Sequence, residues 1–215
     1  MGRCLAVSNV APASWLAETC FRFAPWRLVA GKNGTEAIVP AVSAAPRLPT
    51  LRFMFSHPAH PIALGFGCGL SPWAPGTVGT LWAWLVFLLF RPDMSDAQWG
   101  LVMVGAAAVG WWACTATARG LRTADPGAIV WDEVLAFWLV LWLVTPAGLV
   151  TQFAAFVLFR FFDAAKPGPV GWADRLFKGV QGRPIGWTQG FGVIFDDLVA
   201  AGCTLVVIAA WRWWW

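Results

Sequence analysis

Two adjacent carboxylates lie inside an apolar segment near the end of the chain, and they constrain the fold more than any other feature. Asp196 and Asp197 interrupt the run FGVIFDDLVAAG, and apolar residues continue to Ala210. A charged aspartate at the centre of a membrane helix costs about 2.5–3.5 kcal/mol on insertion scales, and burial without a partner costs more. The fold must therefore supply a partner for this pair.

Two other apolar segments carry acidic residues in the same way. Asp132 and Glu133 precede VLAFWLVLWLV, and Asp163 follows FAAFVLFRFF. Buried charges in proteins are paired with opposite charges or coordinate metal ions. Like charges in three separate apolar segments are best reconciled by a bound cation, so we expect a metal site built from three helices.

The composition indicates a protein embedded in a membrane. Of the 215 residues, 59% are hydrophobic and 12% are charged, whereas about a quarter of a soluble domain is charged. The 17 tryptophans and the absence of tyrosine fit side chains at a lipid–water boundary, and the terminal WRWWW is typical of such a belt. The net charge of +4 is not gathered in a basic run, so we expect the bases to face lipid headgroups and exclude nucleic acid as a partner.

The cysteines and histidines predict neither a disulfide framework nor a zinc site. The five cysteines are odd in number and lack CxxC spacing, so we interpret them as reduced packing residues. His57 and His60 flank prolines without a set of metal-like partners, and we interpret both as structural. Glycines at 65–69 resemble a nucleotide-binding loop, but no strand precedes them, so close helix packing is the simpler interpretation.

Residues 1–53 differ from the rest of the chain. They contain scattered proline and glycine, with Glu18 and Glu36 as the only acids, and no apolar run long enough to span a bilayer. They also lack the ordered regions of a secretory signal. We expect a poorly ordered extension, which is a targeting segment, an over-extended start before Met54, or a floppy tail. One membrane-embedded domain follows at 54–215.

The apolar pattern predicts an all-α fold, a small membrane bundle of four to five helices. We expect these helices at 78–90, 99–118, 131–145, 149–163 and 191–211. Several are shorter than the ~20 residues of a full span. Lysine and arginine gather in the connections at 119–130 and 164–190 and are sparse at 91–98 and 145–149. The positive-inside rule therefore places the first two connections in the cytoplasm.

That orientation brings all the unusual polar residues to the cytoplasmic ends of their helices. Arg160 and Asp163 are one helical turn apart and share a face, and Lys166 precedes a Pro-Gly-Pro stop. Taken alone, this pair could be a surface ion pair, and Asp132 could simply cap its helix. Five carboxylates from three helices, with bases beside them, favour a shared site.

A rigid turn, SPWAPGT at 71–77, is expected on the same side. It places Thr77 as a plausible N-cap of the next helix, and exposed amides at a helix N-terminus suit a phosphate. An ordinary capped helix is an equal alternative for these residues. Mg²⁺ prefers oxygen ligands and is usually shared with a phosphate, and arginine and lysine neutralise charge on a transferring group. The residues therefore predict a phosphate-cleaving enzyme at the cytoplasmic membrane face.

Five stretches, in family order over nearly all of 60–202, resemble the phosphatidylglycerophosphatase A family. They are GFGCGLSPWAPGTVGT, IVWDE, FRFFDAAKPGP, WADR and IFDDLVAAG. The resemblance implies an all-helical, Mg²⁺-dependent enzyme of the bacterial inner membrane that hydrolyses phosphatidylglycerophosphate to phosphatidylglycerol and phosphate. The connection at 178–190 is longer than is usual in the family, and residues 1–53 match nothing in it.

The resemblance also implies roles for particular residues. The metal and catalytic centre is implied to comprise Asp132, Glu133, Asp163, Asp196 and Asp197. Arg160 and Lys166 are implied to lie near the phosphate. The candidate substrate contacts are Ser71, Pro75, Gly76, Thr77 and Arg175.

Two alternatives remain open from the sequence. Intramembrane carboxylates also mark cation or proton pathways, so a transporter is the competing class, although the acids gather at one end and no inverted repeat is visible. The other alternative keeps the phosphatase chemistry but changes the substrate to another phosphorylated lipid or a prenyl phosphate.

Overall fold

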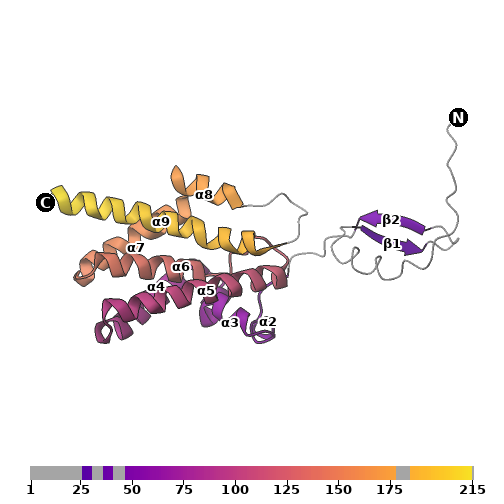
Figure 1. Ribbon diagram of the computed structural model, residues 1–215, viewed down its shortest axis with the longest axis horizontal. Helices are drawn as coiled ribbons and strands as arrows, with labels where there is room; N and C mark the ends of the chain where they lie inside the picture. The colour runs from indigo at the N-terminus through magenta and orange to yellow at the C-terminus, as the bar shows by residue number, and fades with distance from the viewer. Residues whose placement is uncertain (1–25, 31–35, 41–46, 178–184, 215) are drawn as a thin grey trace. The chain divides into compact units, whose positions relative to one another are not determined.

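The computed structural model describes residues 26–30, 36–40, 47–177 and 185–214, and the chain forms two compact units, Met1–Ala44 and Ala45–Trp215 (Figure 1). In the first unit, strands β1 (Trp26–Ala30) and β2 (Glu36–Pro40) pair in antiparallel register. The sequence analysis did not anticipate this hairpin. The apolar segments WRLVA and EAIVP flank GKNGT, whose Asn-Gly pair is a hairpin signal that could have revealed it.

Every described element of the second unit is helical. The longer helices are α4 (Pro75–Phe90), α5 (Asp96–Leu121), α6 (Trp131–Val144), α7 (Leu149–Ala165), α8 (Pro169–Phe177) and α9 (Trp187–Trp214). The short ones are α2 (Leu51–Met54), α3 (Ala59–Ala63), η2 (Gly65–Leu70) and η3 (Arg91–Asp93). Helices occupy all five ranges predicted from the apolar pattern, with shifted ends. Among the described residues, α5 and α9 are long and apolar enough to cross a membrane by length and composition.

Helix α4 begins earlier than predicted. Pro75 occupies its first turn, where proline suits the helix because its fixed φ is helical and its missing N–H would be unbonded anyway. Ala74, directly before it, takes a left-handed backbone conformation with φ 41°. Thr77 therefore lies inside the first turn, and the prediction that Thr77 caps the helix is wrong.

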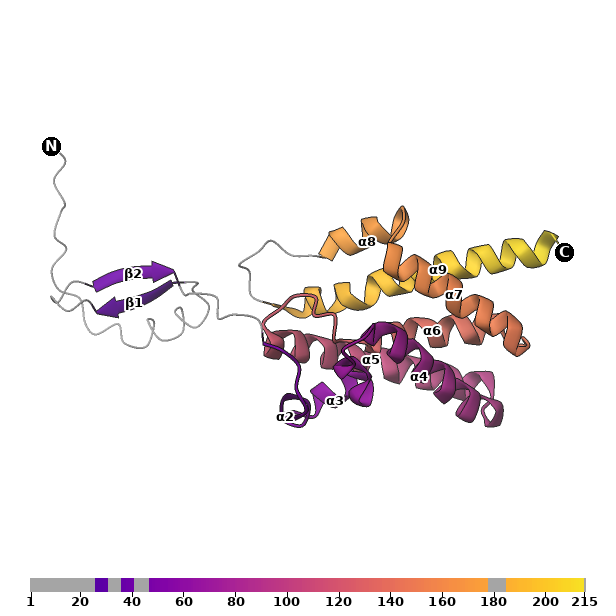
Figure 2. The same ribbon diagram turned by 180° about the vertical axis from the view of Figure 1, so that it is seen from behind.

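Helix α6 forms the centre of the second unit. It packs against α4, α5, α7 and α9, and in both views it lies between α4 and α9 (Figures 1 and 2). Most of its side chains are buried. Trp138 Nε1 donates a hydrogen bond to the carbonyl of Ala83 on α4, at 2.8 Å, and Trp131 Nε1 donates to the carbonyl of Ala106 on α5, at 3.0 Å. These bonds fix the rotation of α6, and with it the direction of the acidic residues in its first turn.

The tryptophans lie in two different environments, the core and the exposed end of α9. Trp99, Trp131 and Trp138 are buried in the core, and the ring of Trp138 contacts the rings of the other two. Trp213 and Trp214, at the end of α9, are exposed. The terminal residues thus suit a lipid–water boundary, whereas the core tryptophans form an aromatic layer that the composition alone did not predict.

The structure describes both histidines and three of the five cysteines. His60 is buried, with Nδ1 2.9 Å from Thr117 Oγ1, and its ring stacks on Phe53. Burial lowers its pKa, and His57 nearby lowers it further. Cys68, Cys114 and Cys203 are free thiols. The other two cysteines lie outside the described residues.

A close contact between helices makes a direct test of this packing possible. A β-carbon at Gly110 of α5 would collide with the indole of Trp131, whereas one at Gly105 of the same helix would meet nothing within 4 Å. We expect Gly110→Ala to lower the thermal unfolding midpoint in detergent, because overpacking costs about 1–3 kcal/mol. The matched control, Gly105→Ala, should leave the midpoint unchanged or raise it, because alanine is favoured over glycine in helices by about 1 kcal/mol. Thermal unfolding is monitored by circular dichroism. Equal midpoints for the two variants would contradict this packing.

Candidate active site

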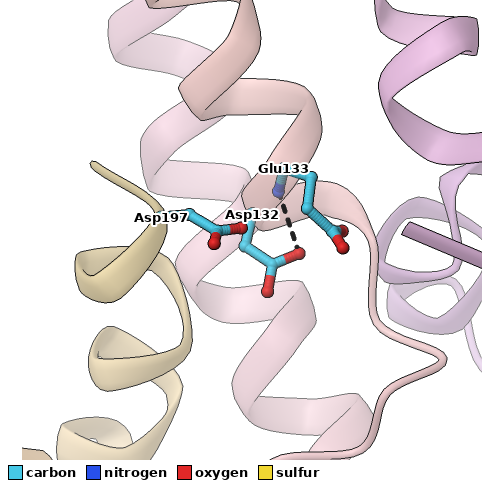
Figure 3. A group of neighbouring side chains, drawn as sticks. All are labelled: Asp132, Glu133 and Asp197. Carbon is cyan, nitrogen blue, oxygen red and sulfur yellow. Dashed lines mark hydrogen bonds between the residues drawn. The ribbon is translucent and has the colours of Figure 1, made fainter. Parts of the chain in front are cut away.

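Three carboxylates converge where the first turn of α6 faces α9. Asp132 and Glu133 come from α6 and Asp197 from α9 (Figure 3). Each offers one oxygen, and these oxygens lie within 4.8 Å of one another. Asp132 and Asp197 are 8% and 4% exposed, and none of the ion pairs between described residues involves either of them. An all-oxygen donor set of this size and burial suits one hard cation.

Arg160 joins this group from α7. Its Nη1 lies 2.5 Å from Asp163 Oδ2 and 3.6 Å from Glu133 Oε1. The prediction that Arg160 and Asp163 share a face is confirmed. Asp163 also lies close enough to Asp197 to interact with it electrostatically.

Two atoms of the site are buried without a hydrogen-bond partner among the described residues. They are Glu133 Oε2 and Arg160 Nε. Buried polar atoms in native structures are nearly always hydrogen-bonded to protein or water, so each of these two atoms is open to a bound water or ligand. A carboxylate oxygen can bind a cation and a guanidinium N–H can bind an anion. The pair therefore offers capacity for both a metal and a phosphate.

The turn before α4 also reaches this site. A β-carbon at Gly76 would collide with Glu133 Oε1 and would lie 3.1 Å from both terminal nitrogens of Arg160. The absent side chain is what lets the backbone come this close. Gly76, in the first turn of α4, thus lies against the carboxylate and guanidinium groups. The contacts of Pro75, Gly76 and Thr77 with substrate stay predictions.

Two predicted substrate contacts are not brought to the site by any described interaction. The Ser71 hydroxyl donates to the carbonyl of Trp73 at 2.8 Å, so it stabilises the turn itself. Arg175 lies on the exposed side of α8 and has no ion pair within the described ranges.

The two adjacent aspartates of α9 have different partners. Asp197 belongs to the three-carboxylate group, whereas Asp196 Oδ2 accepts a hydrogen bond from Lys166 Nζ at 2.5 Å. Successive helical residues point about 100° apart, so the two side chains leave α9 in different directions. Asp196 therefore belongs to a second, neighbouring cluster.

Lys166 is the centre of that second cluster. Helix α7 ends before it, as predicted from the Pro-Gly-Pro sequence, and Lys166 adopts a left-handed conformation with φ 44°. Its Nζ also donates to Asp174 Oδ1 at 2.5 Å. Burial lowers the pKa of Lys166, but the bonds to Asp174 and Asp196 outweigh burial and raise it above its ordinary value. Lys166 is therefore a fixed positive charge at physiological pH.

Asp174 is the residue of this cluster that the sequence analysis did not assign. It lies on α8 and faces a cavity of about 20 Å³, which is also lined by Asp125, Gln189 and Asp196. This volume is enough for about one water molecule. Its membership of the stretch WADR, matched to the family, is the signal that could have found it. Nothing in the spacing from Lys166 to Asp174 predicts the contact, because a chain reversal separates them.

The sequence model of one family, described as Phosphatidylglycerophosphatase A, matches residues 61–212. This chain belongs to the phosphatidylglycerophosphatase A family. The match covers both carboxylate clusters and every helix from α4 onwards. The members are phosphoric monoester hydrolases, and the chain is therefore an enzyme of that class.

Curated relatives agree with this assignment. Phosphatidylglycerophosphatase A of Escherichia coli (strain K12) is 36% identical over 149 residues, which cover 69% of this chain and 80% of the relative. Phosphatidylglycerophosphatase A of Haemophilus influenzae (strain Rd) is 30% identical over 166 residues, which cover 77% and 96%. A Bacteroides thetaiotaomicron protein, provisionally named a phosphatidylinositol-3-phosphatase, is 35% identical over 159 residues, which cover 71% and 92%. No solved structure gives a significant match. The long connection noted at 178–190 lies partly outside the described residues.

The approach of Gly76 to the site can be tested by adding one methyl group. We expect Gly76→Ala to lower phosphatase activity at least about tenfold, a loss of about 1.4 kcal/mol in transition-state stabilisation, because the methyl displaces Glu133 and Arg160. The control is Gly127→Ala, at a position where a β-carbon meets nothing within 4 Å. Steady-state phosphate release is the measurement. Full activity in both variants would mean that the turn does not touch the working site.

Proposed function

We propose that this enzyme hydrolyses the phosphomonoester of phosphatidylglycerophosphate to phosphatidylglycerol and phosphate, with Mg²⁺ as its cofactor. The observation that carries the proposal is the group of three carboxylates beside Arg160, two buried and one half-buried, in a chain whose relatives in two bacteria are named for this activity. Membership of the family supports the chemistry, and the site supports the metal.

The donor set fits Mg²⁺. Carboxylate oxygens are its preferred protein ligands, and neither histidine nor cysteine is among the group. We assign Asp132, Glu133 and Asp197 as the residues that would hold the ion, with the unpartnered Glu133 Oε2 as one donor. A bound Mg²⁺ supplies Lewis-acid polarisation of the phosphoryl oxygen and lowers the pKa of a bound water.

The remaining predicted ligands have a different role in this proposal. Asp163 holds Arg160, and Asp196 holds Lys166. A guanidinium held by a carboxylate is oriented before substrate arrives, so it loses little freedom when it binds phosphate oxygens. We infer that Arg160 and Lys166 neutralise charge on the phosphoryl group as the bond to glycerol breaks. The amides in the first turn of α4 add the positive end of the helix dipole on the same side.

We further propose that the protein spans the bacterial inner membrane with its site on the cytoplasmic side. Large apolar side chains such as Leu101, Val104 and Val206 are exposed on α5 and α9, the two helices with the length to cross a bilayer. Exposed apolar surface on a long helix is expected where lipid is the solvent. A secondary transporter places its binding site near the bilayer midplane, whereas both carboxylate clusters here share one end of the bundle.

The helical domain begins earlier in this proposal than the sequence predicted. The backbone N–H of Arg47 donates to the carbonyl of Leu121 at 2.9 Å, and Phe53 stacks on His60. Residues 47–53 therefore contact the helical unit, and the division between the two units lies at Ala44. We place the start of the enzyme domain there and not at Met54.

A second substrate has a specific observation in its favour. The Bacteroides relative covers as much of this chain as the Escherichia coli enzyme does, at a similar identity, and carries a different substrate in its name. Among the described residues, the proposal assigns groups to the phosphomonoester and to the metal and assigns none to the rest of a headgroup. Substrate choice is therefore tested together with the metal.

The test is phosphate release by purified protein in detergent micelles. The panel contains phosphatidylglycerophosphate, phosphatidic acid and phosphatidylinositol 3-phosphate, each with Mg²⁺ or with EDTA. We expect the first lipid to be hydrolysed fastest and only with Mg²⁺. Asp197→Asn should lower the rate at least about 100-fold, as happens when a group that stabilises transition-state charge is removed, while exposed Asp93→Asn serves as the control. Activity of Asp197→Asn within a few-fold of the parent would exclude it as a ligand.

Topology supplies an independent test. Single cysteines are placed at Asp93, before α5, and at Gly127, before α6, in a background without the native five. An impermeant maleimide on intact spheroplasts should label Asp93→Cys and not Gly127→Cys, because basic connections stay in the cytoplasm. Labelling after permeabilisation should reach both and checks accessibility. The reverse pattern would turn the carboxylates outward and contradict the proposed location.

A further inference from the structure

An open groove of about 540 Å³ lies next to the turn that leads into α4. This volume is in the range of about 300–1,000 Å³ that is typical of small-molecule sites. Its lining residues come from two segments, Pro49, Thr50 and Leu51 on one side and Gly67, Cys68, Leu70, Ser71 and Val78 on the other. The groove is thus framed by the first segment of the helical unit and by η2, with Ser71 and Val78 beside it.

The segment along the groove is apolar and exposed. Leu48, Leu51 and Phe55 are 83%, 65% and 75% exposed. They lie on or beside α2, which has four residues and is far too short to cross a bilayer. A short element with several large apolar side chains in the open is expected to lie in the headgroup region of a membrane.

The charge on this segment has one sign. Arg47 and Arg52 bracket the three lining residues, and the chain has no acidic residue between Glu36 and Asp93. Arginine stems can cover apolar surface while the guanidinium stays at the level of the headgroups. The apolar groove walls suit the acyl chain of an anionic lipid, and the neighbouring arginines suit its negatively charged phosphate.

The turn into α4 separates the groove from the active site. Ser71 and Val78 line the groove, and Gly76, which lies between them in the sequence, is against Glu133 and Arg160 on the other side of the turn. We propose that the groove holds an acyl chain of the anionic phospholipid substrate, with Arg47 and Arg52 on the headgroup side. This inference rests on the proposed function. A lipid bound in this way presents its phosphomonoester to the carboxylates while its chain stays out of water.

The kinetic test compares one headgroup on two chain lengths. Full-length protein is assayed on phosphatidylglycerophosphate with palmitoyl chains in micelles and on its water-soluble butanoyl form. We expect Leu51→Gln to raise KM for the long-chain substrate about fivefold, because apolar contact is lost, with kcat unchanged and both constants unchanged for the short one. Leu101→Gln, an exposed leucine on α5, is the matched control. Equal KM changes on both substrates, or none on either, would overturn the proposal.

A second measurement does not need activity. Cys68 lines the groove and is a free thiol, and burial raises its pKa, so alkylation is followed by mass spectrometry at alkaline pH. Phosphatidylglycerol should slow alkylation of Cys68 more than phosphatidylcholine does, while half-buried Cys203 on α9 shows no such difference. Arg52→Gln should abolish the difference at Cys68. Equal protection by both lipids would show a surface facing bulk lipid and would overturn the inference.

The same measurement on Asp197→Asn separates the two proposals. If the parent hydrolyses none of the three lipids, the proposed function fails. Lipid-selective protection of Cys68 in the inactive variant would then still support an anionic lipid in the groove, and its loss would overturn that too.

Discussion

Carboxylates are buried between α6, α7 and α9, and the rest of the structure must compensate their negative charge. Removing several negative charges from water is expensive, and each needs a positive partner or a cation. The fold meets this need twice, with Arg160 bound to Asp163 and with Lys166 bound to Asp196 and Asp174. The central helix α6 is held by indole hydrogen bonds to its neighbours, which keeps its acidic first turn aimed at α9.

The carboxylates that lack an ion pair are the ones to which the proposed function assigns the metal. Asp132 and Asp197 have no ion pair in the described part of the chain, and they lie with Glu133 in a group small enough for one ion. A metal and a phosphate would together complete this arrangement, because the ion compensates the carboxylates and the phosphate meets Arg160. In the proposed function, substrate and cofactor would thus complete the charge balance of the site, and the same residues would serve binding and catalysis.

A lipid phosphatase must also bring a polar phosphate to buried groups while its acyl chains stay in an apolar environment. The turn at 71–77 lies where both needs meet, with the proposed acyl groove on one side and the carboxylates on the other. Glycine at position 76 is what allows the backbone to pass this close to Glu133. In the two proposals, this close approach would connect the lipid groove with the carboxylates.

The sequence by itself determined the features that depend on local pattern. The apolar ranges predicted the helices, the spacing of Arg160 and Asp163 predicted their contact, and Pro-Gly-Pro predicted the end of α7, because each depends on residues within a turn or two. Only the tertiary structure decided how the acids divide, with Asp197 in the three-carboxylate group, Asp196 on Lys166, and Asp174 brought in from α8. Such contacts depend on how α8 packs on α9 after a chain reversal, and no local pattern encodes the rotation of one helix against another.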